Sequence, residues 1–184
     1  MTIPLAAASP AVYDRRTIYL HWMSAVLVAL LWGVAQVIDL FPRGAPRIAV
    51  RSVHILLGVV LAVVVTRRLL WRRGSGRRLP AAHGGFWGQA ARMGHALLYA
   101  MLVAVIALGI SNAWARGDSI FSLFSVPKLL PNFPSLKPAV GTLHKIGANV
   151  LVIVALMHAL AALFHHYILR DNVLRRMWVP RETP

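Results

Sequence analysis

Residues 144–169 read HKIGANVLVIVALMHALAALFHHYIL. The 24 residues from Ile146 to Leu169 contain no Asp, Glu, Lys or Arg. A helix of about 20 apolar residues crosses the roughly 30 Å hydrocarbon core of a bilayer. The stretch therefore predicts a transmembrane helix, and one that places histidines inside the membrane.

Three further segments have the length and apolar character of membrane spans. Residues 17–38 and 93–115 are free of charged side chains over 22 and 23 positions, whereas the core of the second span, 52–66, has only 15. Extended to residues 48–71, that span is long enough, provided that the side chains of Arg51, Arg67 and Arg68 reach toward the membrane surface. We predict one all-α domain over residues 1–184, an integral membrane four-helix bundle with helices at about 14–39, 48–71, 92–115 and 140–169.

The composition of the 184 residues agrees with a membrane protein. Hydrophobic residues make up 58% of the chain and charged residues 14%, against about 25% charged residues in a soluble domain. A net charge of +15 is also seen in proteins that neutralise nucleic-acid phosphates. Here the basic residues lie between long apolar runs, as in membrane proteins. We therefore expect contact with lipid and none with nucleic acid.

The basic residues also predict the orientation. If the N-terminus is cytoplasmic, thirteen Lys and Arg residues lie inside and seven lie outside. Cytoplasmic loops of membrane proteins carry the excess of Lys and Arg, so both termini are predicted to be cytoplasmic. The outer segment before the last span contains Pro127, Pro131, Pro134 and Pro138, which predicts an irregular loop.

Histidines are the ionisable residues that recur inside these spans. Five lie within them or at their rims: His21, His54, His95, His144 and His158. Ionisable side chains inside a membrane are costly and usually functional, although a single histidine can simply form a hydrogen bond between helices. Five histidines at two depths indicate a site. We expect His165 and His166 to lie at the inner headgroup level.

Helical spacing predicts which histidines face each other. His144 and His158 are fourteen residues apart, a rise of about 21 Å with a rotation that returns to within about 40° of the starting face. His21 precedes Ile38 by 17 residues and His54 follows Ile48 by 6. If Ile38 and Ile48 lie at the same depth, the two histidines differ in depth by 11 residues, close to the 14 that separate His144 from His158. The spacing predicts an outer pair, His54 with His144, and an inner pair, His21 with His158.

Two opposed pairs of imidazoles suit iron in a planar macrocycle. The chain has no cysteine, which excludes iron–sulfur clusters, thiolate zinc sites and covalent haem attachment. Two axial histidines on one haem favour electron transfer over oxygen binding. His95 has three possible roles: it positions one of the iron-binding histidines, it contacts a haem carboxylate, or it forms a hydrogen bond between helices. Arg51, Arg67 and Arg68 are candidates to bind haem propionates, besides serving as topology determinants.

Several short motifs resemble those of the bacterial cytochrome b561 family. They are IYLHW at 18–22, VHILLG at 53–58, GHALLY at 94–99, the His144 to His158 spacing, AALFHHY at 161–167 and DNVLRRM at 171–177. The resemblance extends from about Tyr13 to Met177. It implies a bacterial inner-membrane protein that binds two non-covalent b haems, with His21, His54, His144 and His158 as axial ligands.

The resemblance also implies ubiquinone as a redox partner, and some relatives of this family oxidise superoxide at the outer face. Lys137 and Lys145 are two of the seven predicted outer cations, and a cationic surface raises the arrival rate of a small anion. We therefore expect them to steer such a donor.

Two alternatives follow from the same residues. The chain would be a haem-b anchor subunit if it relayed electrons between quinone and a separate soluble dehydrogenase or hydrogenase. It would be a colourless transporter or channel if the histidines handled metal ions or protons. A soluble protein partner is not required by any feature of the sequence.

Overall fold

The computed structural model describes residues 12–80, 82, 84–128 and 136–178. Within them the chain forms four long helices, α1 (Arg15–Val37), α2 (Ala45–Arg73), α3 (Gly85–Arg116) and α4 (Leu136–Tyr167). Each is long and apolar enough to cross a membrane. The prediction of an all-α transmembrane four-helix bundle is confirmed.

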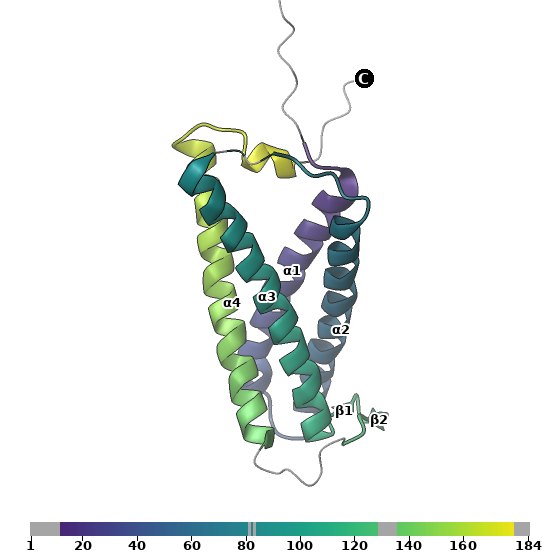
Figure 1. The fold of residues 1–184 in the computed structure, drawn as a ribbon. Helices are drawn as coiled ribbons and strands as arrows, with labels where there is room; N and C mark the ends of the chain where they lie inside the picture. The colour runs from purple at the N-terminus through teal and green to yellow at the C-terminus, as the bar shows by residue number, and fades with distance from the viewer. Residues whose placement is uncertain (1–11, 81, 83, 129–135, 179–184) are drawn as a thin grey trace, which may run out of the picture.

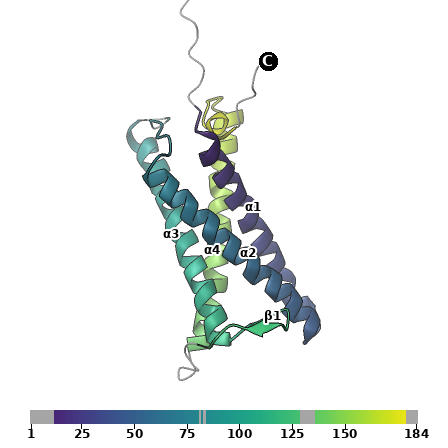
Figure 2. The ribbon, with the colours of Figure 1, turned by 90° about the vertical axis from the view of Figure 1, so that its right-hand side faces the viewer.

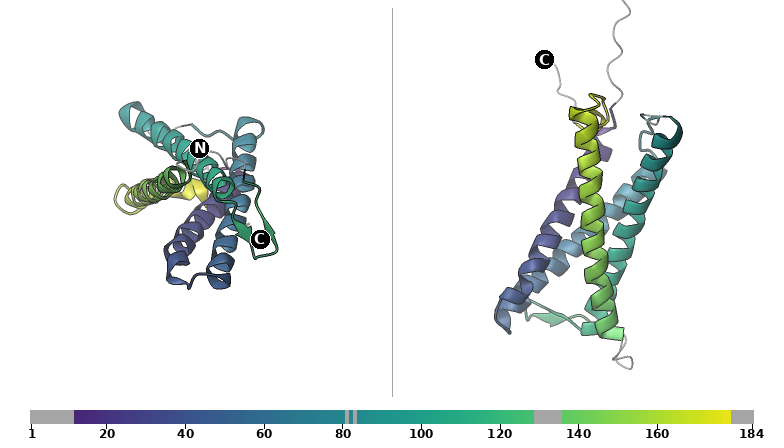
Figure 3. Two further views of the ribbon diagram at one scale, coloured as in Figure 1. Left: turned by 90° about the horizontal axis from the view of Figure 1, so that it is seen from below. Right: turned by 90° about the vertical axis from the view of Figure 1, so that its left-hand side faces the viewer.

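The helices form two antiparallel hairpins. Helix α1 packs along α2, and α3 packs along α4, with fewer contacts between the two hairpins. The helices cross at an angle and splay toward their ends, as Figures 2 and 3 show. The first and last described residues lie at the same end of the bundle (Figure 1). That this end is cytoplasmic stays a prediction from the basic residues.

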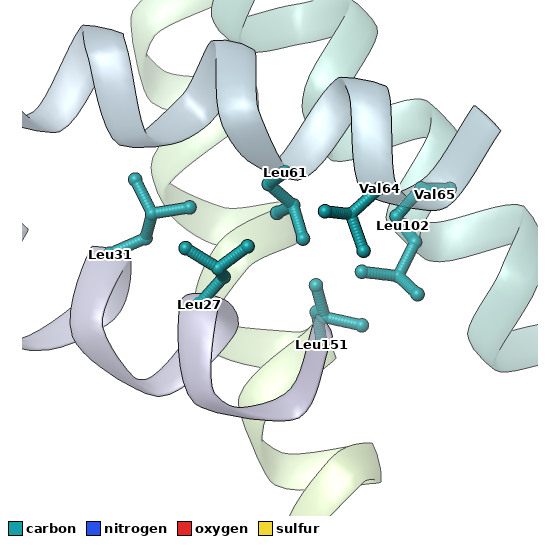
Figure 4. Close-up of a cluster of buried hydrophobic side chains, with 7 residues drawn as sticks. All are labelled: Leu27, Leu31, Leu61, Val64, Val65, Leu102 and Leu151. Atoms are coloured by element: carbon teal, nitrogen blue, oxygen red, sulfur yellow. The ribbon is translucent and has the colours of Figure 1, made fainter. Parts of the chain in front are cut away.

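A cluster of buried aliphatic side chains joins all four helices (Figure 4). Its members are Leu27, Leu31, Leu61, Val64, Val65, Leu102 and Leu151. Leu151 lies seven residues from both His144 and His158, nearly two helical turns in each direction. The cluster therefore forms an apolar layer between the two histidine levels.

Two helices begin earlier than predicted. Helix α3 begins at Gly85 instead of residue 92, because the helix extends beyond the apolar run into the preceding segment that contains Arg92. Helix α4 begins at Leu136 instead of residue 140. Pro138 therefore lies in its first turn, where the missing N–H has no intrahelical partner to lose. Helix α1 ends at Val37 and continues as the 3-10 helix η1 (Ile38–Leu40).

A small β-hairpin that follows the C-terminal end of α3 was not predicted. Strands β1 (Ser119–Ile120) and β2 (Phe124–Ser125) pair antiparallel. The fully buried Ser52 hydroxyl attaches this hairpin to α2, since it accepts from the Phe121 N–H at 2.8 Å and donates to the Ile48 carbonyl at 2.8 Å. Residues 129–135, which include Pro131 and Pro134, lie outside the described residues.

The segment after α4 returns across the end of the bundle that holds the start of α1. It includes the 3-10 helix η2 (Leu174–Met177), the short yellow helix in Figure 1. The Trp22 indole N–H donates to the Met177 carbonyl at 3.0 Å, and the Arg176 guanidinium donates to the Pro80 carbonyl at 2.7 Å. The segment therefore ties α1 and the α2–α3 connection to α4.

Asp14 caps α1 and joins it to the far end of α2. Its carboxylate accepts from the N–H and hydroxyl of Thr17 at 2.9 and 2.7 Å, from the Trp71 indole at 3.0 Å and from the Arg77 N–H at 3.1 Å. Burial alone would raise the pKa of Asp14, but these hydrogen bonds lower it from 3.8 to about 2.

We expect Asp14→Ala to destabilise the bundle by about 1–2 kcal/mol, because it removes a helix cap and two bonds between elements. A carboxylate whose folded pKa is depressed contributes stability above its unfolded pKa of 3.8 that is lost as the pH falls toward about 2. Thermal unfolding at pH 7 and at low pH, followed by circular dichroism, should therefore show the two proteins converging in acid. The control is Asp39→Ala, because the Asp39 side chain is 88% exposed in its ion pair with Arg47. Equal losses in both variants at pH 7 would contradict the assigned role.

Candidate functional site

The outer pair of histidines comes together as the spacing predicts. The rings of His54 on α2 and His144 on α4 have centroids 6.2 Å apart and planes at 88°. Nδ1 of His144 lies 3.1 Å from the Val105 carbonyl. Because a carbonyl only accepts, Nδ1 carries the proton and Nε2 keeps its lone pair. Gly109 lies against this ring, since a Cβ at that position would be 3.0 Å from Cε1 of His144.

The inner level brings three imidazoles together. His21 on α1 faces His158 on α4, with centroids 6.4 Å apart and planes at 73°. His95 on α3 also faces His158, at 5.2 Å and 73°. Nδ1 of His95 donates to the Ala91 carbonyl at 2.7 Å, which leaves its Nε2 unprotonated. His95 therefore lies beside His158, and its Nδ1 hydrogen bond stays within α3 instead of reaching another helix.

The spacing of both predicted pairs fits one iron between two axial ligands. An imidazole nitrogen lies about 2 Å from a bound transition metal and its ring centre about 1 Å farther back, so two opposed ligands have centroids about 6 Å apart. The observed 6.2 and 6.4 Å match this value, whereas the 5.2 Å between His95 and His158 is shorter. The Nδ1–H of His144 bonded to a carbonyl is the usual arrangement of a metal-binding histidine. The residues present therefore fit bis-histidine haem at both levels.

Arg68 is the predicted arginine that the structure brings to the histidines. Its guanidinium donates to Nδ1 of His21 at 2.8 Å and to the Ser24 hydroxyl at 2.9 Å. Its Cζ atom also lies 5.0 Å from the centroid of the Tyr99 ring. Cζ of Arg72 lies 5.6 Å from the same centroid. If His21 held haem iron through Nε2, its Nδ1 would carry the proton and could not accept the bond from Arg68. The Arg68 guanidinium would then be available to bind a haem carboxylate.

The other two predicted arginines lie elsewhere. Arg51 forms an ion pair with Asp118 at 3.4 Å, and Arg116 binds the same carboxylate at 3.2 Å. Arg67 is exposed and lines a shallow groove with Val59 and Ile110. Among the described residues, no hydrogen bond joins either arginine to a histidine.

A cationic pocket lies at the C-terminal end of α3 and the N-terminal end of α4, the end of the bundle that is predicted to face outward. Its lining consists of Asn112, Arg116, Lys137, Pro138, Gly141, Thr142 and Lys145, around a volume of roughly 450 Å³. Both lysines predicted to steer an anion line it. Gly141 and Lys145 flank His144 in α4, and Asn112 is one turn from Gly109 in α3. The pocket therefore lies within about one helical turn of His144 along the chain, although neither histidine of the pair is among its lining residues.

Several residues of these sites were not found from the sequence. Asn112, Gly109, Arg72 and Tyr99 all lie on helices whose rotation about their axes is set by packing. Asn112 could have been found from the sequence because its polar side chain lies within the charge-free run 93–115. Polar side chains in a membrane span usually have a partner or a function.

His165 and His166 lie in the last turn of α4, and their location at the inner headgroup level stays a prediction. The imidazole of His165 bonds the Asp171 carboxylate through Nδ1. Nδ1 of His166 is buried without a hydrogen-bond partner in the described part of the chain.

The comparisons with known proteins show the family of the chain. The profile of the family described as prokaryotic cytochrome b561 matches residues 12–180. Cytochrome b561 homolog 1 of Escherichia coli is 32% identical, with 92% of this chain and 97% of the relative covered. A probable superoxide oxidase CybB of Yersinia pestis is 30% identical (90% and 94% covered), and cytochrome b562 of Cereibacter sphaeroides is 29% identical (92% and 96% covered). The chain therefore belongs to the prokaryotic cytochrome b561 family, whose members are multi-pass inner-membrane electron-transfer proteins with b-type haem.

Proposed function

We propose that the protein holds two b haems, one between His54 and His144 and one between His21 and His158, and that it oxidises superoxide and reduces ubiquinone. The observation that carries this proposal is the pair of imidazole separations near 6 Å at two depths of one bundle. When bound, haem supplies a one-electron redox couple. In the overall reaction two superoxide anions lose one electron each and become dioxygen. Ubiquinone takes up the two electrons and two protons and becomes ubiquinol.

The outer pocket supports an anionic donor. Three cations line it, and the ion pair with Asp118 occupies one of them, Arg116. The two lysines thus provide most of the uncompensated positive charge. A concave surface of one sign concentrates small ions of the opposite sign and raises their association rate. The name of the Yersinia relative, a probable superoxide oxidase, agrees with this donor, and ubiquinone as acceptor rests on the family resemblance.

Replacing both Lys137 and Lys145 with glutamate tests the donor. We expect the second-order rate constant for superoxide consumption at low ionic strength to fall about tenfold or more, and its decline with added salt to flatten or reverse. The measurement is haem reduction by superoxide in a stopped-flow instrument over a range of salt concentrations.

The matched control is Lys128→Glu, which makes the same charge change on the same side of the protein but outside the pocket. A double variant with the rate and salt dependence of the wild type would rule out steering by this pocket. Co-purification of a soluble partner in equal amount would favour the anchor-subunit alternative instead.

A further inference from the structure

Two arginine side chains near the inner histidines have no carboxylate partner. Arg68 is half-buried in α2, and Arg72 is exposed one helical turn further along the same helix. Their Cζ atoms lie 5.0 and 5.6 Å from the centroid of the Tyr99 ring on α3. Among the described residues, neither guanidinium forms an ion pair with an acidic side chain. Two positive charges therefore share one aromatic ring without a countercharge from this part of the chain.

The arginine near the outer histidine pair differs in this respect. Arg51 lies three residues before His54, and its guanidinium is 3.4 Å from the carboxylate of Asp118, whose side chain is only 9% exposed. A charged side chain inside a membrane span is costly, and such groups usually pair with an opposite charge. The outer arginine obtains that charge from the protein. The inner arginines lack it, which points to a ligand that carries negative charge.

Ser24 holds the guanidinium of Arg68 beside the inner histidines. The Ser24 side chain is buried, and its hydroxyl donates toward the Leu20 and His21 carbonyls, each 2.8 Å away. Its oxygen is therefore free to accept from Nη1 of Arg68 at 2.9 Å. Nη2 of Arg68 lies 2.8 Å from Nδ1 of His21. If Nδ1 of His21 carried a proton, Nη2 would lose this acceptor, while the bond from Nη1 to Ser24 would still fix the guanidinium.

We propose that Arg68 and Arg72 bind the two propionate carboxylates of the inner haem. A haem has two propionate side chains, and the planar fork of a guanidinium matches a carboxylate. The Tyr99 ring supports both guanidinium groups, because the face of an aromatic ring attracts a cation, and Ser24 positions that of Arg68. This inference rests on the proposed function for the presence of the inner haem, and it adds the residues that recognise its carboxylates.

The test compares haem with haem dimethyl ester, in which both propionates are esterified and carry no charge. The full chain is prepared without haem and titrated in detergent with each compound, and the inner haem is identified by the spectrum that remains in His144→Ala. We expect the wild-type inner site to bind haem at least about tenfold more tightly than the ester. Arg68→Leu and Arg72→Leu should each weaken haem binding about tenfold and leave ester binding nearly unchanged. Ser24→Ala should have a smaller effect of the same kind, because the charge of Arg68 remains.

The matched control is Arg67→Leu, which makes the same change of charge at the neighbouring exposed position and should keep the wild-type affinities for both compounds. A second measurement uses protein purified with its haem. Transfer of the inner haem to excess apomyoglobin should be faster in Arg68→Leu and Arg72→Leu than in Arg67→Leu. An unchanged content of outer haem establishes that each variant is folded.

Equal affinity of the wild-type inner site for haem and for its ester would overturn the inference. Wild-type haem affinity in both Arg68→Leu and Arg72→Leu would also overturn it. Either result in a protein that still binds two haems leaves the proposed function intact. A wild-type protein that binds no haem would contradict the proposed function and this inference together.

Discussion

Replacing His158 with alanine is expected to leave one haem per chain, against the two that we propose for the wild type. His158 faces His21 at the inner level and is more than three helical turns from His144. Its loss removes an axial ligand from the inner pair and leaves the outer pair intact, with the bond from His144 to the Val105 carbonyl in place. His144→Ala should have the reciprocal effect.

The pairing itself is tested by comparing four alanine variants. The pyridine haemochrome assay gives the haem content, and reduced-minus-oxidised spectra distinguish the two haems. His21→Ala should give the same single-haem spectrum as His158→Ala, and His54→Ala the same as His144→Ala. The two kinds of spectrum should add up to that of the wild type.

A lipid-facing residue of the same helix provides the control. Leu160 is 55% exposed on α4, and Leu160→Ala should keep both haems. Loss of the outer haem alone in His158→Ala would contradict the pairing. A colourless wild-type protein would instead agree with the transporter or channel interpretation.

Gly109→Val is expected to abolish the outer haem and to leave the inner one. A Cβ at this position would lie 3.0 Å from Cε1 of His144, which is tighter than most contacts of a Cβ atom, and 3.4 Å from Nδ1. The two further methyl groups of valine would push the ring away from His54 and from the Val105 carbonyl. Gly109→Ala requires the His144 ring to shift by only a few tenths of an ångström. We therefore expect it to weaken the binding of the outer haem without abolishing it.

The control for this change is Gly33→Val on α1, where a Cβ meets no atom within 4 Å. Both substitutions place the same β-branched residue in a helix, so they share the intrinsic helix propensity change. Haem content and the single-haem spectrum of His144→Ala are the measurements. Two full haems in Gly109→Val would refute the close packing of this helix against the ligand, as would equal haem loss in Gly33→Val.

The sequence by itself determined four spans and the order of the histidines along them. Three spans have charge-free runs of 22 to 24 residues, and the second has a charge-free core of 15. Such apolar segments form helices in a membrane, because their backbone hydrogen bonds must be made internally. The spacing of His144 and His158 places both on nearly one face of α4 wherever that helix packs. Depth in the membrane and the direction within one helix are local properties, so they could be read from the chain.

The tertiary structure decided which residues of different helices meet. Arg67 and Arg68 are neighbours in sequence, yet only Arg68 reaches His21, because one residue of α-helix turns a side chain by about 100°. The rotation of α3 about its axis, which places Gly109 on His144 and Asn112 in the outer pocket, depends on how its side chains pack against α4. That packing is set by the buried aliphatic cluster and the crossing angles of all four helices, which no single stretch of sequence contains.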